Sequence, residues 1–104
     1  MYNRSKIYKI ISNQTDKIYI GSTTEKYLSN RLGSHNKAYK QWLQKKADYQ
    51  TVFEIMKHED AQIRLIELYP CESKDELKSR EQFHIDLNPD ICVNKLKINK
   101  QQQV

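Results

Sequence analysis

Alternating apolar and polar positions in residues 6–21 predict a β-hairpin. Two short runs rich in Ile and Tyr flank residues 13–16, Asn-Gln-Thr-Asp, all of which are common in turns. If these four residues form the loop, Ser12 pairs with Lys17, and further along the strands Ile10 pairs with Tyr19. The hairpin is the stretch around which we expect the rest of the chain to be organised.

Side chains alternate between the two faces of a strand, so this register sorts the hairpin into two surfaces. Four isoleucines share one face, which we expect to be core. Tyr8, Ile10, Lys17 and Tyr19 share the other, with Tyr8 diagonal to Tyr19 and within reach of its ring. Two phenols and an amine are unusual for a surface that only has to be solvated, so this face is a candidate site.

Helical spacing follows the hairpin. From Tyr27 onward, apolar residues recur at helical intervals as far as Leu43, with Thr24 as a candidate N-cap. Gly33 lies inside this segment and weakens it by about 1 kcal/mol relative to Ala, so a bend or a close contact is expected there. Residues 51–57 predict a short second helix.

The second half of the chain predicts one more strand and one more helix. Residues 63–69 are apolar and β-prone and stop at Pro70. Ser73 and Glu76 then form a capping box that opens a helix running to about Leu87. We therefore expect an α/β (α+β) fold, a small three-stranded mostly antiparallel sheet flanked by helices. It forms one domain over residues 1–98, with a disordered tail at residues 99–104.

The net charge of +5 is unevenly placed along the 104 residues. Residues 1–46 hold ten basic and two acidic side chains, a surplus of +8, whereas residues 47–104 hold eight and eleven, a net −3. A basic half is typical of a surface that attracts a polyanion, most often nucleic acid. A merely solvated surface explains the charge equally well, so charge alone leaves both interpretations open.

The sequence indicates neither a membrane protein nor a disulfide-stabilised one. No apolar run approaches the roughly 18 residues of a membrane span, and no signal peptide opens the chain. Cys71 and Cys92 lack the spacing and His partners of a zinc site. We expect reduced, partly buried thiols and an intracellular protein.

Glu81 is the most informative carboxylate. In the helix from Ser73 it shares the core-facing stripe with Leu77, His84 and Ile85. A carboxylate there must be paired or hold a cation, because an isolated buried charge is very costly. A salt bridge at the edge of the core, or a helix phase that turns Glu81 outward, are the ordinary alternatives, and His84 is interpreted as a packed histidine.

Arg31 and His35 lie four residues apart on one helix face. They combine a permanent planar cation, suited to phosphate, with a group that titrates near neutrality. Alone, such a pair on a basic helix is a weak signal. Asn94, in a predicted turn, is weaker still.

The order of these pieces resembles the GIY-YIG nuclease domain. The pieces are Lys6-Ile7-Tyr8, Tyr19-Ile20-Gly21, Arg31 through His35, Arg80-Glu81-Gln82-Phe83 and Val93-Asn94. Each is short, but five in this order, at spacings close to those of phage homing endonucleases, are specific, and they cover residues 6–94. One departure is Lys6, which stands where the first motif has glycine. The strand and Tyr8 of that motif remain, and Lys6 is interpreted as DNA-facing.

The resemblance implies a metal-dependent DNA endonuclease. Glu81 would be the only protein carboxylate on a single Mg²⁺, with Mn²⁺ as a substitute and with water and phosphate oxygens completing the shell. Tyr8 would take the proton of the attacking water, and Tyr19 would orient that water. Because a free phenol has a pKa near 10, cations must stabilise its phenolate, and Lys17 and His35 are the candidates.

The remaining roles follow from the same resemblance. Arg31 would neutralise charge growing on the scissile phosphate, and Asn94 would hold the site together through hydrogen bonds to Tyr8 or to nearby backbone. DNA would be held through phosphate contacts with little sequence preference, since no DNA-recognition domain is appended. The candidate contacts are the basic residues of the first half of the chain: Lys6, Lys9, Lys17, Lys26, Lys37 and Lys40.

Two alternatives stay open. One is a structure-selective repair or recombination nuclease that acts with a targeting partner protein. The other is a non-catalytic member that binds nucleic acid or protein through the same fold. Catalysis is favoured because Tyr8, Tyr19, Arg31, Glu81 and Asn94 are all present.

Overall fold

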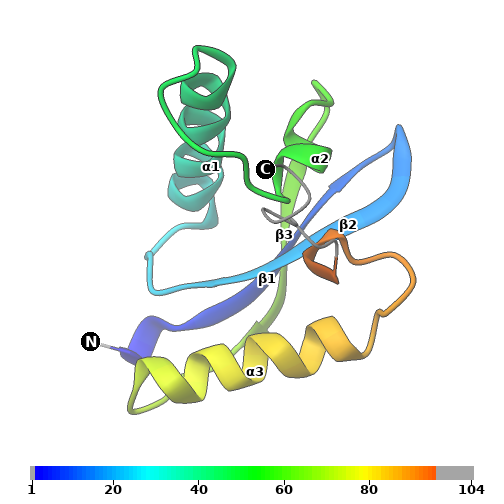
Figure 1. Ribbon diagram of the computed structural model, residues 1–104. Coiled ribbons are helices and arrows are strands. Elements are labelled where there is room, and N and C mark those ends of the chain that lie inside the picture. The colour runs from blue at the N-terminus through cyan, green and yellow to red at the C-terminus, as the bar shows by residue number, and fades with distance from the viewer. Residues whose placement is uncertain (1, 96–104) are drawn as a thin grey trace, which may run out of the picture.

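A three-stranded antiparallel sheet with helices on both faces forms the structure, a computed structural model that describes residues 2–95 (Figure 1). The strands lie in the order β2-β1-β3, and this arrangement confirms the predicted fold class. The predicted domain end at residue 98 and the tail at residues 99–104 lie outside the described residues. The elements are a 3₁₀ turn Tyr2–Arg4, β1 Lys6–Ser12, β2 Thr15–Thr23, α1 Leu28–Leu43, α2 Phe53–Met56, β3 Gln62–Leu68, α3 Lys74–Asp86 and a 3₁₀ turn Val93–Lys95.

The hairpin is tighter than the sequence predicts. Ile10 pairs with Tyr19 as expected, but Ser12 pairs with Thr15, so the predicted pairing of Ser12 with Lys17 is wrong. The register shifts between Ile10 and Ser12, which shortens the loop to two residues. Asp60 explains the difference, because its carboxylate accepts hydrogen bonds from the Ser12 hydroxyl and from the backbone N–H of Asn13.

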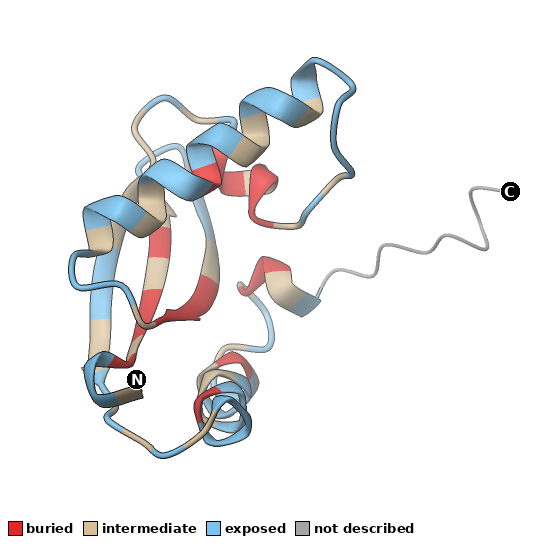
Figure 2. Ribbon diagram, turned by 90° about the vertical axis from the view of Figure 1, so that its left-hand side faces the viewer, coloured by how far each residue is buried: buried red, intermediate tan, exposed pale blue. Residues whose placement is uncertain are grey.

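Both faces of the sheet are core. Ile7 and Ile20 pack with Leu77 and Ile85 of α3. The opposite face, predicted to be the polar one, packs against α1 and α2, and its Tyr8 is completely buried. Figure 2 shows buried residues along β1 and β2 and in α2, with α1 and α3 exposing their outer surfaces on either side. Tyr8 is therefore held inside the protein, and Tyr19 is partly buried beside it.

The third helix begins as the capping box predicts, and the first helix does not. The Ser73 hydroxyl accepts a hydrogen bond from the Glu76 backbone N–H at 3.2 Å and caps α3. The N-cap of α1 is Tyr27, whose side chain makes no capping hydrogen bond, so the assignment of Thr24 was wrong. The strand predicted at residues 63–69 and the short helix at 51–57 are present as β3 and α2.

No helix within residues 2–95 has the length and apolar character that a membrane span requires.

Gly33→Ala should stabilise the protein. Gly33 lies inside α1, and a Cβ added there would meet no atom within 4 Å. The substitution therefore gains helix propensity without a clash, about 0.8–1.0 kcal/mol of unfolding free energy. Urea unfolding at neutral pH measures the change. A loss of stability would show that the backbone at Gly33 needs the freedom of glycine.

Candidate active site

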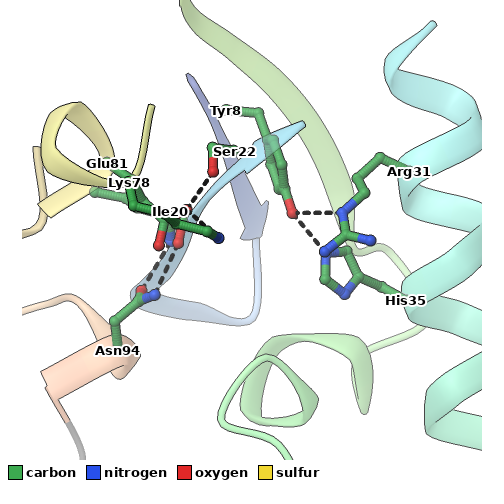
Figure 3. A network of polar contacts seen from close by, with 8 residues as sticks. All are labelled: Tyr8, Ile20, Ser22, Arg31, His35, Lys78, Glu81 and Asn94. Carbon is green, nitrogen blue, oxygen red and sulfur yellow. Dashed lines mark hydrogen bonds and ion pairs between the residues drawn. The ribbon is translucent and has the colours of Figure 1, made fainter. Parts of the chain in front are cut away.

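The Tyr8 hydroxyl is held between two side chains of α1. Its oxygen lies 2.6 Å from Nε2 of His35 and accepts a hydrogen bond from Nε of Arg31 at 3.1 Å (Figure 3). Arg31 and His35 are four residues apart, so one face of α1 presents both to the sheet. The structure thus brings together three residues that the sequence places 23 and 27 positions apart.

His35 is neutral at physiological pH. Burial and, secondarily, the nearby charge of Arg31 lower its pKa to about 4. A neutral imidazole can accept at Nε2, and a guanidinium can only donate, so the Tyr8 O–H donates to His35. The expectation that His35 supplies a positive charge to the phenol is wrong, because the ring is buried beside a permanent cation. That cation, Arg31, is the one that touches Tyr8.

Neither phenol ionises easily in the free protein. Burial raises the pKa of Tyr8, and the charge and hydrogen bond of Arg31 oppose that rise only in part. Burial, together with the neighbouring Tyr8, raises the pKa of Tyr19 as well. The two rings lie 6.4 Å apart between centroids, and Tyr19 also packs edge-on against His35. The site therefore holds two protonated phenols around one neutral imidazole.

Gly21 makes room for this arrangement. It pairs with Tyr8 across the hairpin, and a Cβ there would lie 2.5 Å from Cζ of Tyr8 and 3.0 Å from Cε2 of Tyr19. The first distance is too short for a real carbon contact, and the second is unusually tight. The glycine at the end of Tyr19-Ile20-Gly21 is thus required by the Tyr8 ring that lies over it.

Glu81 approaches β2 from α3. Its Oε1 accepts a hydrogen bond from the Ser22 hydroxyl at 2.6 Å and lies 3.3 Å from Nζ of Lys78. Within residues 2–95, Oε2 has no hydrogen-bond partner, and 17% of the side chain is exposed. Ser22 is not among the residues that the sequence singles out, although its position directly after Gly21 puts its side chain on the α3 face.

Strand β2 separates the Glu81 group from the Tyr8 group (Figure 3). Ser22 pairs with Ile7 on the face covered by α3, whereas Gly21 pairs with Tyr8 on the face covered by α1. The two groups still act on each other, because the negative charge of Glu81 raises the pKa of both Tyr8 and Tyr19. The carboxylate and the phenols therefore lie within electrostatic range across the sheet edge.

Asn94 binds the backbone of β2. Its Oδ1 accepts from the Ile20 N–H at 2.9 Å and its Nδ2 donates to the Ile20 carbonyl at 2.7 Å. Nearby, the Ile18 N–H donates to the Ile91 carbonyl at 2.9 Å. Of the two partners expected for Asn94, backbone and not Tyr8 is the one observed. The side chain fixes the strand that carries Tyr19 and Gly21.

Two of the lysines predicted to act on substrate are held by the chain itself. The Lys17 ammonium donates to the Asp90 carbonyl at 3.0 Å and does not contact either phenol, which corrects its expected place beside Tyr8. The Lys6 ammonium donates to the carbonyls of Arg4 and Glu25, at 2.8 and 2.6 Å. The other candidates differ in exposure: Lys9 is half-buried on β1, and Lys26, Lys37 and Lys40 are exposed.

A metal ion at this site would have few protein ligands. Across residues 2–95 there is no group of three or more His, Cys, Asp or Glu side chains that could bind an ion. Glu81 alone, with Oε2 free of protein hydrogen bonds, suits a hard cation such as Mg²⁺, which keeps several waters and is commonly held by one or two carboxylates. The donor set is therefore compatible with one Mg²⁺ and provides little affinity by itself.

Comparison with protein families finds a match. The model of the GIY-YIG catalytic domain matches residues 4–97, nearly the whole chain, and spans all the candidate site residues named above. Neither the curated proteins nor the solved structures include a significant match.

Gly21→Ala should destabilise the protein and displace Tyr8. The added methyl forces the buried phenol away from Arg31 and His35, at a cost of about 1–3 kcal/mol in unfolding free energy. Urea unfolding of this variant beside Gly33→Ala gives a matched pair, the same chemical change with opposite expected signs. Two stabilising substitutions would mean that the hairpin does not press Tyr8 against Gly21.

Acid should unfold the protein partly through His35. The folded pKa is about 4 and the ordinary value is 6.5, so between these pH values the unfolded chain binds more protons. Stability is therefore full above about pH 6.5 and falls as the pH drops towards 4, by on the order of 1–3 kcal/mol. His35→Gln should flatten the unfolding free energy over this window relative to the wild type. Equal slopes in the two proteins would contradict the assignment.

Proposed function

The chain belongs to the GIY-YIG catalytic-domain family, and from this premise we propose that it is a metal-dependent DNA endonuclease. Family membership indicates a nuclease-type domain. The observation that carries the finer proposal is the Tyr8 hydroxyl, buried yet hydrogen-bonded to both a guanidinium and a neutral imidazole. A phenol that only filled the core would need one ordinary partner.

Tyr8 acts in this proposal as a proton carrier. Its hydroxyl already donates to His35, so it can pass that proton to Nε2 while its oxygen takes a proton from the attacking water. The phenol then remains neutral overall, and the raised pKa that burial gives Tyr8 does not have to be overcome by a stable phenolate. Tyr19, packed against both rings, would orient the water.

Substrate charge would help His35 to accept the proton. Burial and the charge of Arg31 hold its pKa to about 4 in the free protein. A DNA phosphate beside Arg31 offsets part of that positive charge, so protonation of the imidazole becomes less costly once DNA is bound. The proton relay would thus depend on DNA being bound at the site.

Arg31 would stabilise the charge that grows on the phosphate oxygens. Its Nε is committed to Tyr8, and within residues 2–95 its two terminal nitrogens have no hydrogen-bond partner. A cation fixed in a partly buried site needs no rearrangement when charge develops, which makes this kind of stabilisation the largest single contribution in many enzymes.

Glu81, oriented by the Ser22 hydroxyl, would hold one Mg²⁺ or Mn²⁺. When bound, the ion supplies Lewis-acid stabilisation of the phosphate charge. Asn94 would keep β2 in place between the carboxylate and the phenols. DNA would be held mainly by phosphate contacts, with Lys26, Lys37 and Lys40 as exposed contributors.

The proposal predicts Mg²⁺-dependent nicking that requires Glu81. Supercoiled plasmid should be nicked by the wild type, and Glu81→Gln should reduce the rate by roughly 10²-fold or more, because the amide does not hold the cation. EDTA should have a similar effect on the wild type. DNA affinity measured in EDTA should be no weaker in the variant, which separates chemistry from binding.

The matched control is Glu76→Gln, the same change on an exposed position of the same helix, which should nick at the wild-type rate. Full activity of Glu81→Gln would refute the metal assignment. Absence of cleavage by the wild type on duplex, branched and single-stranded DNA would instead favour a non-catalytic nucleic-acid-binding role.

A further inference from the structure

A shallow hollow of about 390 Å³ adjoins the site between the first turns of α1 and α3. The end of β2 and the chain after it, residues 22–25, line it. Ser22, which binds Glu81, and Arg31, which binds Tyr8, both line it. The hollow therefore touches both halves of the candidate active site and continues away from them.

Basic side chains dominate this hollow. Arg31 lines the α1 side, and Lys74 and Lys78 line the α3 side. Glu25 is the one carboxylate in the lining, so the charged groups sum to about +2. Lys74 and Lys78 come from the half of the chain, residues 47–104, that has a net negative charge.

Helical spacing explains how α3 presents Lys74 and Lys78 to the hollow. Lys74 and Lys78 are four residues apart and Glu81 follows three later, which places the three on one stripe facing β2. Asp75 and Glu76 fall on other sides of the helix and do not line the hollow. The helix thus separates its own charges and turns the lysines towards the site.

Both lysines are available to a ligand. Lys74 is exposed and makes no hydrogen bond within the described part of the chain. Lys78 lies 3.3 Å from Glu81, but 54% of its side chain is exposed. An ammonium group has three N–H donors, so Lys78 can keep its contact with Glu81 and still donate to another anion on its exposed side.

We propose that this hollow binds a backbone phosphate of the DNA strand next to the one that is cleaved, with Lys74 and Lys78 as its ligands opposite Arg31. The inference rests on the proposed function and adds the path of the DNA strand to it. The substrate strand leaves the site across residues 22–25, between α1 and α3. A phosphate diester fits the lining because the hollow is open, polar and positively charged.

The test is the salt dependence of DNA binding, measured by fluorescence anisotropy with a labelled duplex in EDTA. Each phosphate contact contributes about 0.9 to the slope of log affinity against log salt. Lys74→Gln/Lys78→Gln should reduce the magnitude of that slope by about one, because one phosphate contact is lost, and Lys74→Gln alone should reduce it by less. Affinity at low salt should fall by about tenfold or more in the double variant. Equal thermal unfolding temperatures confirm that the exposed substitutions leave the fold intact.

The matched control is Lys45→Gln/Lys46→Gln, the same loss of charge at the opposite end of α1, roughly 24 Å away along the helix. It should keep the wild-type slope. Backbone amide NMR shifts at residues 22–25 on adding DNA should be present in the control and absent in the Lys74/Lys78 variant.

An unchanged slope in the Lys74/Lys78 variant, or an equal loss in the control, overturns the phosphate site. If plasmid nicking fails but the slope of the Lys74/Lys78 variant still falls by about one, the proposed chemistry is wrong and the phosphate site stands.

Discussion

The whole arrangement depends on a tyrosine hydroxyl placed inside a hydrophobic core. Tyr8 is completely buried among apolar residues, and a buried hydroxyl without partners would cost several kcal/mol. Arg31 and His35 provide those partners, and Gly21 provides the space. Each of the three is therefore explained first by the needs of Tyr8, and the chemistry that we propose uses the same contacts.

Strand β2 distributes the site over both faces of the sheet. Two adjacent residues, Gly21 and Ser22, point to opposite sides, so one meets Tyr8 and the other meets Glu81. A shift of one residue in the pairing of β1 with β2 would exchange these two faces. The geometry of the site therefore depends on the hairpin register. Asn94 binds both backbone groups of Ile20 and so fixes β2 against the turn Val93–Lys95.

Sequence patterns predict what depends on local spacing and miss what depends on surroundings. The sheet, the capped third helix and the pairing of Ile10 with Tyr19 follow from periodicity and turn chemistry. Alternation predicts the face of Lys17 but not the Asp90 carbonyl that its ammonium reaches. The sequence predicts a cation at His35, whereas the burial beside a guanidinium that keeps it neutral depends on tertiary packing. The Ser22 contact needs the distance between two elements, which no spacing rule provides.

The bond between Asn94 and Ile20 joins positions 74 residues apart in the chain. Contacts of such long range form late in folding, since the entropy of closing a large loop is lost before the contact is gained. On a ribosome, the hairpin emerges long before the segment that clamps it. A nascent polypeptide would thus carry both tyrosines yet lack a finished catalytic centre, and any ability to cut DNA would begin only after synthesis has passed Asn94.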